Sequence, residues 1–188
     1  MKGIASLNRI FVVCVLAGLM LSCSSSSQIT DSKGKQLDDL VSSKNFEIIS
    51  DRAFPLATAS LNSISNAGLL PPGSSAGQIS LIGNSNYLRI LGDSVAVYLP
   101  YYGERQMGGG YDTDGAGIEF EGIPTEMEIT QDKVTQRYDL RFKMKDDSEN
   151  FNFNITLFPN LTSMISVSSS QRFPIRYSGA IKDLPKNK

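Results

Sequence analysis

Acidic residues at short spacing are the first candidates for chemistry in this sequence. Asp112 and Asp114 stand in Asp-Thr-Asp-Gly, which is similar to the start of a calcium loop. The full loop needs a third ligand before the glycine and the sequence has none, so we expect no metal site and keep calcium as an alternative. Four glutamates that could supply a glycosidase carboxylate pair follow: Glu119, Glu121, Glu126 and Glu128. They alternate with apolar residues, which favours a solvated sheet face.

The chain contains no histidine and no tryptophan. A Ser-His-Asp or Cys-His catalytic arrangement therefore cannot be assembled, and zinc sites lose their commonest nitrogen ligand. Both cysteines, Cys14 and Cys23, lie in the first 23 residues, so the body has no thiol for a disulfide or a nucleophile. We expect a protein that is not an enzyme and that carries no cofactor.

Tyrosine is the remaining residue type with a functional signature. Five tyrosines lie on or beside one predicted hairpin: Tyr87, Tyr98, Tyr101, Tyr102 and Tyr111. Tyrosine offers a rigid contact surface with a polar tip, as binding patches require. Aromatic residues are equally ordinary in β-sheets, and Tyr87 with Tyr98 would also make a plain cross-strand pair. The pattern indicates a possible binding surface and leaves the structural alternative open.

The charge balance excludes one class of partner. Of the 188 residues, 18 are basic and 19 are acidic, and no block of like charge stands out. Nucleic acid binding depends on a clustered positive field, so we expect no nucleic acid partner.

The amino terminus reads as a secretion signal. Lys2 and Arg9 precede an apolar run of 12 residues, 10–21, which is shorter than the roughly 20 needed to span a bilayer. Ser22-Cys23 then resembles the bacterial lipobox, at which the cysteine is lipidated and becomes the first mature residue. The alternative is an ordinary secretory signal with Cys23 near the cut. We expect a lipoprotein signal over 1–22, a membrane anchor on Cys23, and a location at the cell envelope, in the outer membrane, facing the periplasm or the outside.

The segment after the signal is predicted to be a polar tether over 23–35, followed by one β-rich domain over 36–188. Leu37, Leu40 and Val41 have helical spacing within Lys35 to Ser43, so a short helix is plausible there.

The stretch from Tyr87 to Gly103 predicts a β-hairpin. Gly92-Asp93 suits a two-residue turn, and the flanks alternate apolar and polar residues. This turn pairs Leu91 with Ser94 and Tyr87 with Tyr98. The strand should end at Pro100, which lacks an N–H donor.

Other segments alternate in the same way and predict further strands: 46–54, 117–123, 125–130, 136–144, 151–158, 161–167 and 173–181. About nine short strands without a clear helical crossover indicate an all-β fold, an antiparallel meander that closes as a sandwich or barrel. Residues 56–85 and 104–117 interrupt the pattern. The first is predicted to be an ordered excursion whose aliphatic residues plug one end of the sheet, with a mobile lid as the alternative.

The chain resembles a family known as domain of unknown function 4251. The resemblance rests on Phe46-Glu-Ile, Pro55, residues 86–103 with Tyr-Leu-Pro-Tyr-Tyr-Gly, Gly117-Ile-Glu-Phe120 and Tyr177-Ser-Gly-Ala-Ile181. It implies a Gram-negative envelope protein with a lipoprotein-type leader, and it implies no activity, substrate or catalytic residue.

The sequence therefore leads to two hypotheses. The first is a lipid-anchored envelope protein with a non-catalytic binding or scaffolding β-domain and an unknown protein or small-molecule partner. The second is a carrier that holds an apolar small molecule inside a barrel or sandwich cavity. A carrier needs an internal cavity of some hundreds of Å³, whereas a scaffold is solid inside and carries its contact patch on the surface.

Overall fold

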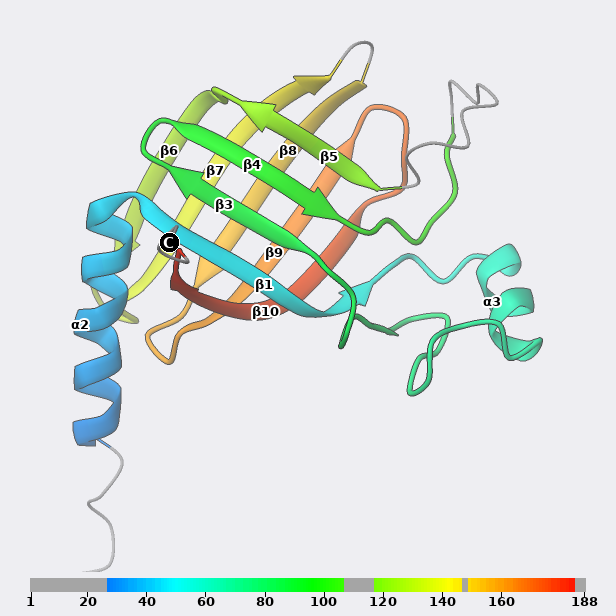
Figure 1. The fold of residues 1–188 in the computed structure, drawn as a ribbon, viewed down its shortest axis with the longest axis horizontal. Coiled ribbons are helices and arrows are strands. Elements are labelled where there is room, and N and C mark those ends of the chain that lie inside the picture. The colour runs from blue at the N-terminus through cyan, green and yellow to red at the C-terminus, as the bar shows by residue number, and fades with distance from the viewer. Residues whose placement is uncertain (1–26, 107–116, 147–148, 185–188) are drawn as a thin grey trace, which may run out of the picture.

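The computed structural model describes residues 27–106, 117–146 and 149–184. Its two helices are α2 (Ser27–Ser43) and α3 (Ala59–Asn66). Its strands are β1 (Asn45–Phe54), β2 (Ile79–Ser80), β3 (Tyr87–Leu91), β4 (Ser94–Leu99), β5 (Ile118–Gly122), β6 (Thr125–Asp132), β7 (Arg137–Asp146), β8 (Glu149–Leu157), β9 (Thr162–Ser169) and β10 (Ile175–Asp183). Within these residues the prediction of an all-β antiparallel fold with one N-terminal helix is confirmed (Figure 1).

The strands form one ten-stranded sheet that curls into a half-barrel (Figure 1). Their order is β5-β4-β3-β1-β10-β9-β8-β7-β6, with the short β2 paired to β1. Consecutive strands are mostly neighbours, as in a meander, but β1 lies between β3 and β10 and joins the two halves. The sheet does not close, because β5 and β6 are its two edges and do not pair with each other. The helices lie at opposite ends of the half-barrel.

The predicted hairpin is β3 and β4, with the register read from the sequence. Tyr87 pairs with Tyr98 and Leu91 with Ser94. Gly92 has a φ of 68°, a conformation that glycine adopts without strain. Four apolar side chains of this hairpin are at most 1% exposed: Leu88, Ile90, Val95 and Val97. Strand β4 ends at Leu99, directly before Pro100.

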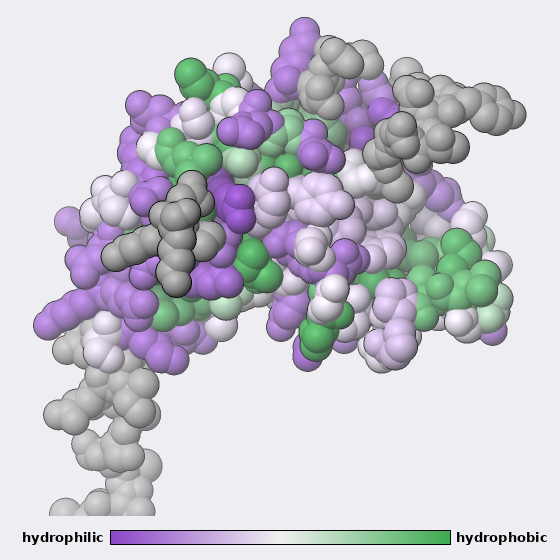
Figure 2. All heavy atoms as spheres, viewed as in Figure 1, coloured by the Kyte–Doolittle hydropathy of each residue, from purple (hydrophilic) through white to green (hydrophobic). Residues whose placement is uncertain are grey.

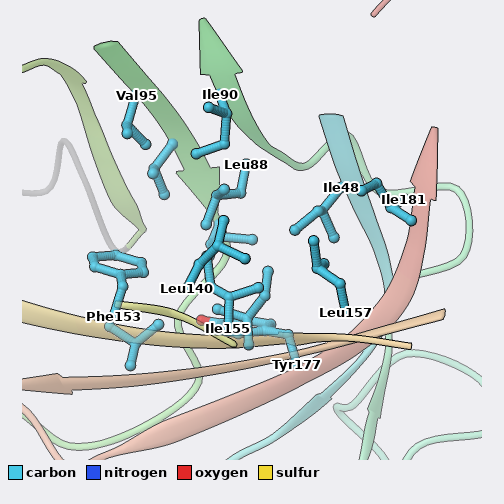
Figure 3. Close-up of a cluster of buried hydrophobic side chains, with 14 of the residues drawn as sticks. Ile48, Leu88, Ile90, Val95, Leu140, Phe153, Ile155, Leu157, Tyr177 and Ile181 are labelled. Carbon is cyan, nitrogen blue, oxygen red and sulfur yellow. The ribbon is translucent and has the colours of Figure 1, made fainter. Parts of the chain in front are cut away.

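Large side chains fill the inside of the curled sheet (Figure 3). Leu88, Ile90 and Val95 from β3 and β4 point across the interior toward side chains of β7, β8 and β10. The largest fully buried residues include Tyr177, Phe142 and Phe153. The rings of Phe142 and Phe153 stack at 4.8 Å between centroids. The interior is thus a packed apolar core.

A bulge in β1 brings the backbones of β1 and β10 unusually close together. The register of β1 against β10 shifts after Ser50, which faces Gly179. A Cβ on Gly179 would overlap the carbonyl oxygen of Ile49, so only glycine fits there. On the side of β1 away from β10, the Asn86 side-chain amide makes two hydrogen bonds with the Ser50 backbone. Its oxygen accepts from the Ser50 N–H at 2.8 Å, and its nitrogen donates to the Ser50 carbonyl oxygen at 2.9 Å. Asn86 thereby acts as a strand partner where the ladder is interrupted.

Helix α2 starts earlier than predicted and includes residues 27–35 of the expected tether. Gly34, Leu37, Leu40 and Val41 form its buried stripe, and the last three residues belong to the main core. Tertiary contact therefore stabilises a helix whose own sequence is mostly polar. In the part of the chain that the structure describes, no helix is long and apolar enough to cross a membrane.

The excursion over 56–85 plugs the sheet only in part. Leu61, Ile79 and Leu81 are at most 7% exposed, in line with the expectation. The expectation is wrong for three other aliphatic residues, Ile64, Leu69 and Ile82, whose exposed fractions are 41%, 75% and 85%. The segment projects from the body around α3, so these side chains have no core to reach (Figure 1).

Candidate functional site

Two of the five predicted tyrosines lie on the outer face of the sheet. The rings of Tyr87 and Tyr98 are 5.9 Å apart, and Tyr98 is 40% exposed. The guanidinium carbon of Arg89 lies 4.1 Å from the centre of the Tyr87 ring, a cation–π geometry. These three side chains form a half-exposed aromatic surface, named here the outer tyrosine surface.

A buried carboxylate fixes the cation of this surface. Glu47 on β1 is only 4% exposed although it faces outward. Its carboxylate contacts Arg89 Nε at 3.1 Å and Lys182 Nζ at 3.4 Å. Because the charges compensate one another, Arg89 is held over the Tyr87 ring. The outer tyrosine surface is therefore preorganised.

Tyr101 and Tyr102 lie elsewhere, after the end of β4. The Tyr101 hydroxyl has one proton to donate, and two carbonyl oxygens lie within its reach, that of Phe173 at 3.0 Å and that of Glu104 at 3.2 Å. Its ring covers Gly103, where a Cβ would approach the Tyr101 hydroxyl oxygen to 2.5 Å. Burial raises the pKa of Tyr101, which keeps the phenol neutral. Tyr102 is half-buried against the core. Both side chains contribute to the structure at this end of the sheet.

Next to Tyr101, a charged cluster closes one end of the half-barrel. Glu149 is 4% exposed. Its carboxylate oxygens accept hydrogen bonds from Arg172 Nε at 3.0 and 3.1 Å and from Arg105 Nη2 at 3.1 Å. The Ser169 hydroxyl donates to the same carboxylate. Arg172 Nη1 also donates to the carbonyl of Gly117 at 2.9 Å. We name this the ion-cluster end.

The sequence pattern did not identify Glu149, which lies between the predicted strands 136–144 and 151–158. Strand β8 begins at Glu149, and this residue stands two positions before the inward-facing Phe151. Extending the alternation by one step would have placed the carboxylate inside the sheet. A buried glutamate then requires cationic partners, but no local pattern identifies Arg105 and Arg172 as those partners.

The opposite end, named the helix end, is covered by α2 and keeps a pocket of about 360 Å³. Its lining consists of Lys44, Asp93, Ile123, Pro124, Met127 and Ile129. Lys44 follows α2 with a φ of 47°, and its carbonyl accepts the Gly92 N–H at 2.7 Å. This backbone geometry sets the Lys44 ammonium 3.2 Å from the Asp93 carboxylate at the rim. The pocket thus combines four apolar lining residues with one exposed ion pair.

The predicted carboxylates do not converge. Glu119 and Glu121 on β5 face Tyr98 and Ala96 across the ladder. Glu126 forms an ion pair with Lys143, and Glu128 faces Arg141. Within residues 27–106, 117–146 and 149–184, no group of three potential metal ligands is present. Tyr111, Asp112, Asp114 and the lipidation candidate Cys23 lie outside the described residues.

Comparison with known proteins agrees with this architecture. The model of a family described as domain of unknown function, DUF4251, matches residues 29–181. The chain belongs to the DUF4251 family. A crystal structure of a DUF4251 family protein from Bacteroides eggerthii DSM 20697 superposes with a TM-score of 0.53 and 10% sequence identity. The match covers 81% of this chain and 88% of that one, and at this identity it supports the fold alone. No curated protein matches the chain.

Membership confirms the resemblance read from the sequence. The residues on which that resemblance rested now have structural roles. Asn86 and Gly179 maintain the β1 bulge, while Tyr101 and Gly103 pack on each other at the ion-cluster end. These four residues therefore have roles in the scaffold of this fold.

Proposed function

We propose that this DUF4251 protein is a lipid-anchored protein of the cell envelope, held at the outer membrane through Cys23, facing the periplasm or the outside. Its β-domain acts as a non-catalytic binding or scaffolding module. The outer tyrosine surface is the contact surface of this module, because its aromatic rings and its fixed cation suit recognition of a partner.

One observation carries the choice of a surface binder over an internal carrier. Aromatic and aliphatic side chains fill the curled sheet, and Tyr177, Phe142 and Phe153 are less than 2% exposed. A ligand in that position would displace part of the core, at a cost of several kcal/mol in stability. A solid body with a preorganised outer face is therefore the better match to the geometry.

The polar groups inside the sheet support a non-catalytic role. Glu149 has two arginines and a serine as partners, and the Tyr177 hydroxyl donates to the Pro100 carbonyl at 2.9 Å. Burial raises the pKa of Tyr177, so its proton stays in this hydrogen bond. Groups that are fully engaged in the scaffold have little capacity to act on a substrate.

The anchor is tested by replacing each cysteine separately in cells supplied with an alkyne fatty acid. Cys14→Ser, the matched control, should keep the fatty acid label and stay with the membrane fraction. Cys23→Ser should lose the label completely, because the acylated sulfur is gone. Label retained on the Cys23→Ser protein would contradict the lipoprotein assignment, even if leader cleavage also failed.

The outer tyrosine surface is tested by in-cell crosslinking of the anchored protein. Crosslinked products should fall at least fivefold in a Tyr87→Ser/Tyr98→Ser double variant with unchanged far-ultraviolet circular dichroism. Thr156→Ser on β8 serves as the distant control. Undiminished crosslinking in the double variant would argue against this surface.

The pocket at the helix end favours a second candidate function, carriage of a small apolar molecule. Four of its six lining residues are apolar: Ile123, Pro124, Met127 and Ile129. Its volume of about 360 Å³ is at the lower end of small-molecule sites. Titration with a dansyl-labelled fatty acid should give saturable binding that Met127→Asp weakens at least tenfold. Val134→Asp, at an exposed valine outside the pocket, is the control, and an equal effect of both variants would reject the carrier.

A further inference from the structure

The excursion between β1 and β3 carries no charge. From residue 53 to residue 88 the chain has no Asp, Glu, Lys or Arg, although 20% of the whole chain is charged. A run of 36 residues at that average would carry about seven charges. The segment includes α3 and its connections, and most of its residues lie at the molecular surface. An exposed segment without charges is unusual, because surfaces normally rely on charged residues for solubility.

Between β1 and β3, this segment also exposes half of its eight large aliphatic side chains. Four of them are 41–85% exposed: Leu56, Ile64, Leu69 and Ile82. Figure 2 shows hydrophobic residues gathered over α3 and its neighbouring segments, away from the purple surface of the body. We name these four residues the uncharged surface. Aliphatic side chains exposed together on an uncharged segment favour contact with another apolar phase.

The uncharged surface is held in place by the body. Leu61 on α3 is 7% exposed, and the Thr58 hydroxyl caps the helix by accepting from the Leu61 N–H at 3.2 Å. The hydroxyls of Ser60 and Thr58 also bond the Glu104 carboxylate, which lowers its pKa. These contacts join α3 to the segment after β4. The exposed aliphatic side chains are therefore presented by an ordered support.

The position of α2 indicates what this surface meets. In Figure 1, α2 and α3 stand at opposite ends of the body, and the N-terminal end of α2 and the excursion around α3 both lie toward its lower edge. Cys23 precedes Ser27 by four residues, a span of at most about 14 Å. Acyl chains on Cys23 would thus lie near the end of α2. A bilayer that holds them would face the uncharged surface.

We propose that the uncharged surface inserts into the interfacial layer of the membrane that holds the lipid anchor. The absence of charge fits this role, because charged side chains oppose entry into the apolar layer, whereas Leu and Ile favour it. A few aliphatic side chains bind membranes weakly by themselves. The anchor raises their effective concentration at the bilayer, so a weak contact is sufficient. This inference rests on the proposed lipid anchor.

Fluorescent labels at single sites test the contact. Because an acylated Cys23 has no free thiol, one introduced cysteine is the only labelling site of the mature protein. Leu69→Cys and Ile82→Cys test the surface, and Glu121→Cys is the control, since Glu121 is an exposed residue of β5 that does not line the pocket. The acylated protein, purified from membranes, is reconstituted in phosphatidylethanolamine–phosphatidylglycerol vesicles that contain spin-labelled lipid. Intact mass spectrometry reports acylation on the same samples.

We expect quenching by the spin-labelled lipid to be at least threefold stronger at Leu69 and Ile82 than at Glu121. Equal quenching at all three sites in acylated protein would overturn the membrane contact and leave the anchor intact. An unacylated mass would overturn the proposed anchor instead. A blue-shifted Leu69 label without lipid quenching, together with a dimer in sedimentation, would show that a second copy covers the surface and would also overturn the inference.

Discussion

The two ends of the half-barrel are closed by opposite means. At the ion-cluster end, Glu149, Arg105 and Arg172 fill the opening with charges that satisfy one another. At the helix end, Leu37, Leu40 and Val41 of α2 cover the opening with aliphatic side chains. The first closure is specific in geometry and leaves no spare polar group on Glu149. The second is non-directional and leaves a pocket beside the helix.

The difference shows where function is to be sought. Buried charges are tolerated only when every partner is present, so the ion-cluster end cannot easily change its partners. Apolar contacts have no such requirement, and a pocket with mostly apolar lining residues can exchange solvent for a ligand. The two ends therefore should respond differently to substitution, and four measurements compare them.

The largest effect is expected at the ion-cluster end. Glu149→Gln leaves Arg172 buried without its anion, which should lower the free energy of unfolding by about 3–5 kcal/mol. Urea denaturation measures the loss. Glu128→Gln, at an exposed glutamate of β6, is the matched control and should change stability by less than about 0.5 kcal/mol. Similar values for the two variants would remove the distinction between the ends.

At the helix end, Leu37→Ala should cost about 3 kcal/mol, because Leu37 is completely buried and its truncation leaves a cavity. The same urea experiment applies, with Val134→Ala as the control, since Val134 is 92% exposed. Hydrogen exchange should also show faster opening of α2 than of β7 and β8 in the Leu37→Ala protein. Uniform acceleration throughout the sheet would contradict separate closure of this end.

A pH dependence belongs to the same end. Burial, together with the hydrogen bond to Asp38 at 2.8 Å, raises the pKa of Tyr138 from 10.0 to about 12. The folded state thus holds this proton more tightly than the unfolded state. The stabilisation is complete below pH 10 and is lost as the pH rises from 10 toward 12. Urea denaturation at pH 9 to 11 should show that the free energy of unfolding falls more steeply with pH for the parent protein than for Tyr138→Phe. Parallel pH profiles of the two proteins would refute the contribution of Tyr138.

The smallest effect is expected for the ion pair at the rim of the pocket. Lys44 and Asp93 are 46% and 86% exposed in their side chains, so solvent screens their attraction. A double-mutant cycle with Lys44→Ala and Asp93→Ala should give a coupling below about 0.5 kcal/mol. A coupling comparable to that of Glu149 with Arg172 would mean that both ends are closed electrostatically.

Sequence patterns were sufficient for the parts of the fold that depend on neighbours in the chain. Alternation predicted the long strands, and Gly92-Asp93 predicted the register of β3 with β4 residue by residue. The same reasoning placed the five tyrosines near one hairpin, but it could not separate the outer pair, Tyr87 and Tyr98, from Tyr101 at the ion-cluster end. That separation depends on where the chain runs after β4 ends at Leu99.

By itself the sequence determined the strand-forming segments, the absence of histidine chemistry and the uncharged excursion, since composition and periodicity are local properties. Only the tertiary structure decided that β1 lies between β3 and β10, that β5 and β6 do not pair with each other, and that Glu149 meets Arg105 and Arg172. The physical reason is that these contacts join residues far apart in the chain. Their free energy depends on burial and geometry that exist only once the whole sheet has curled.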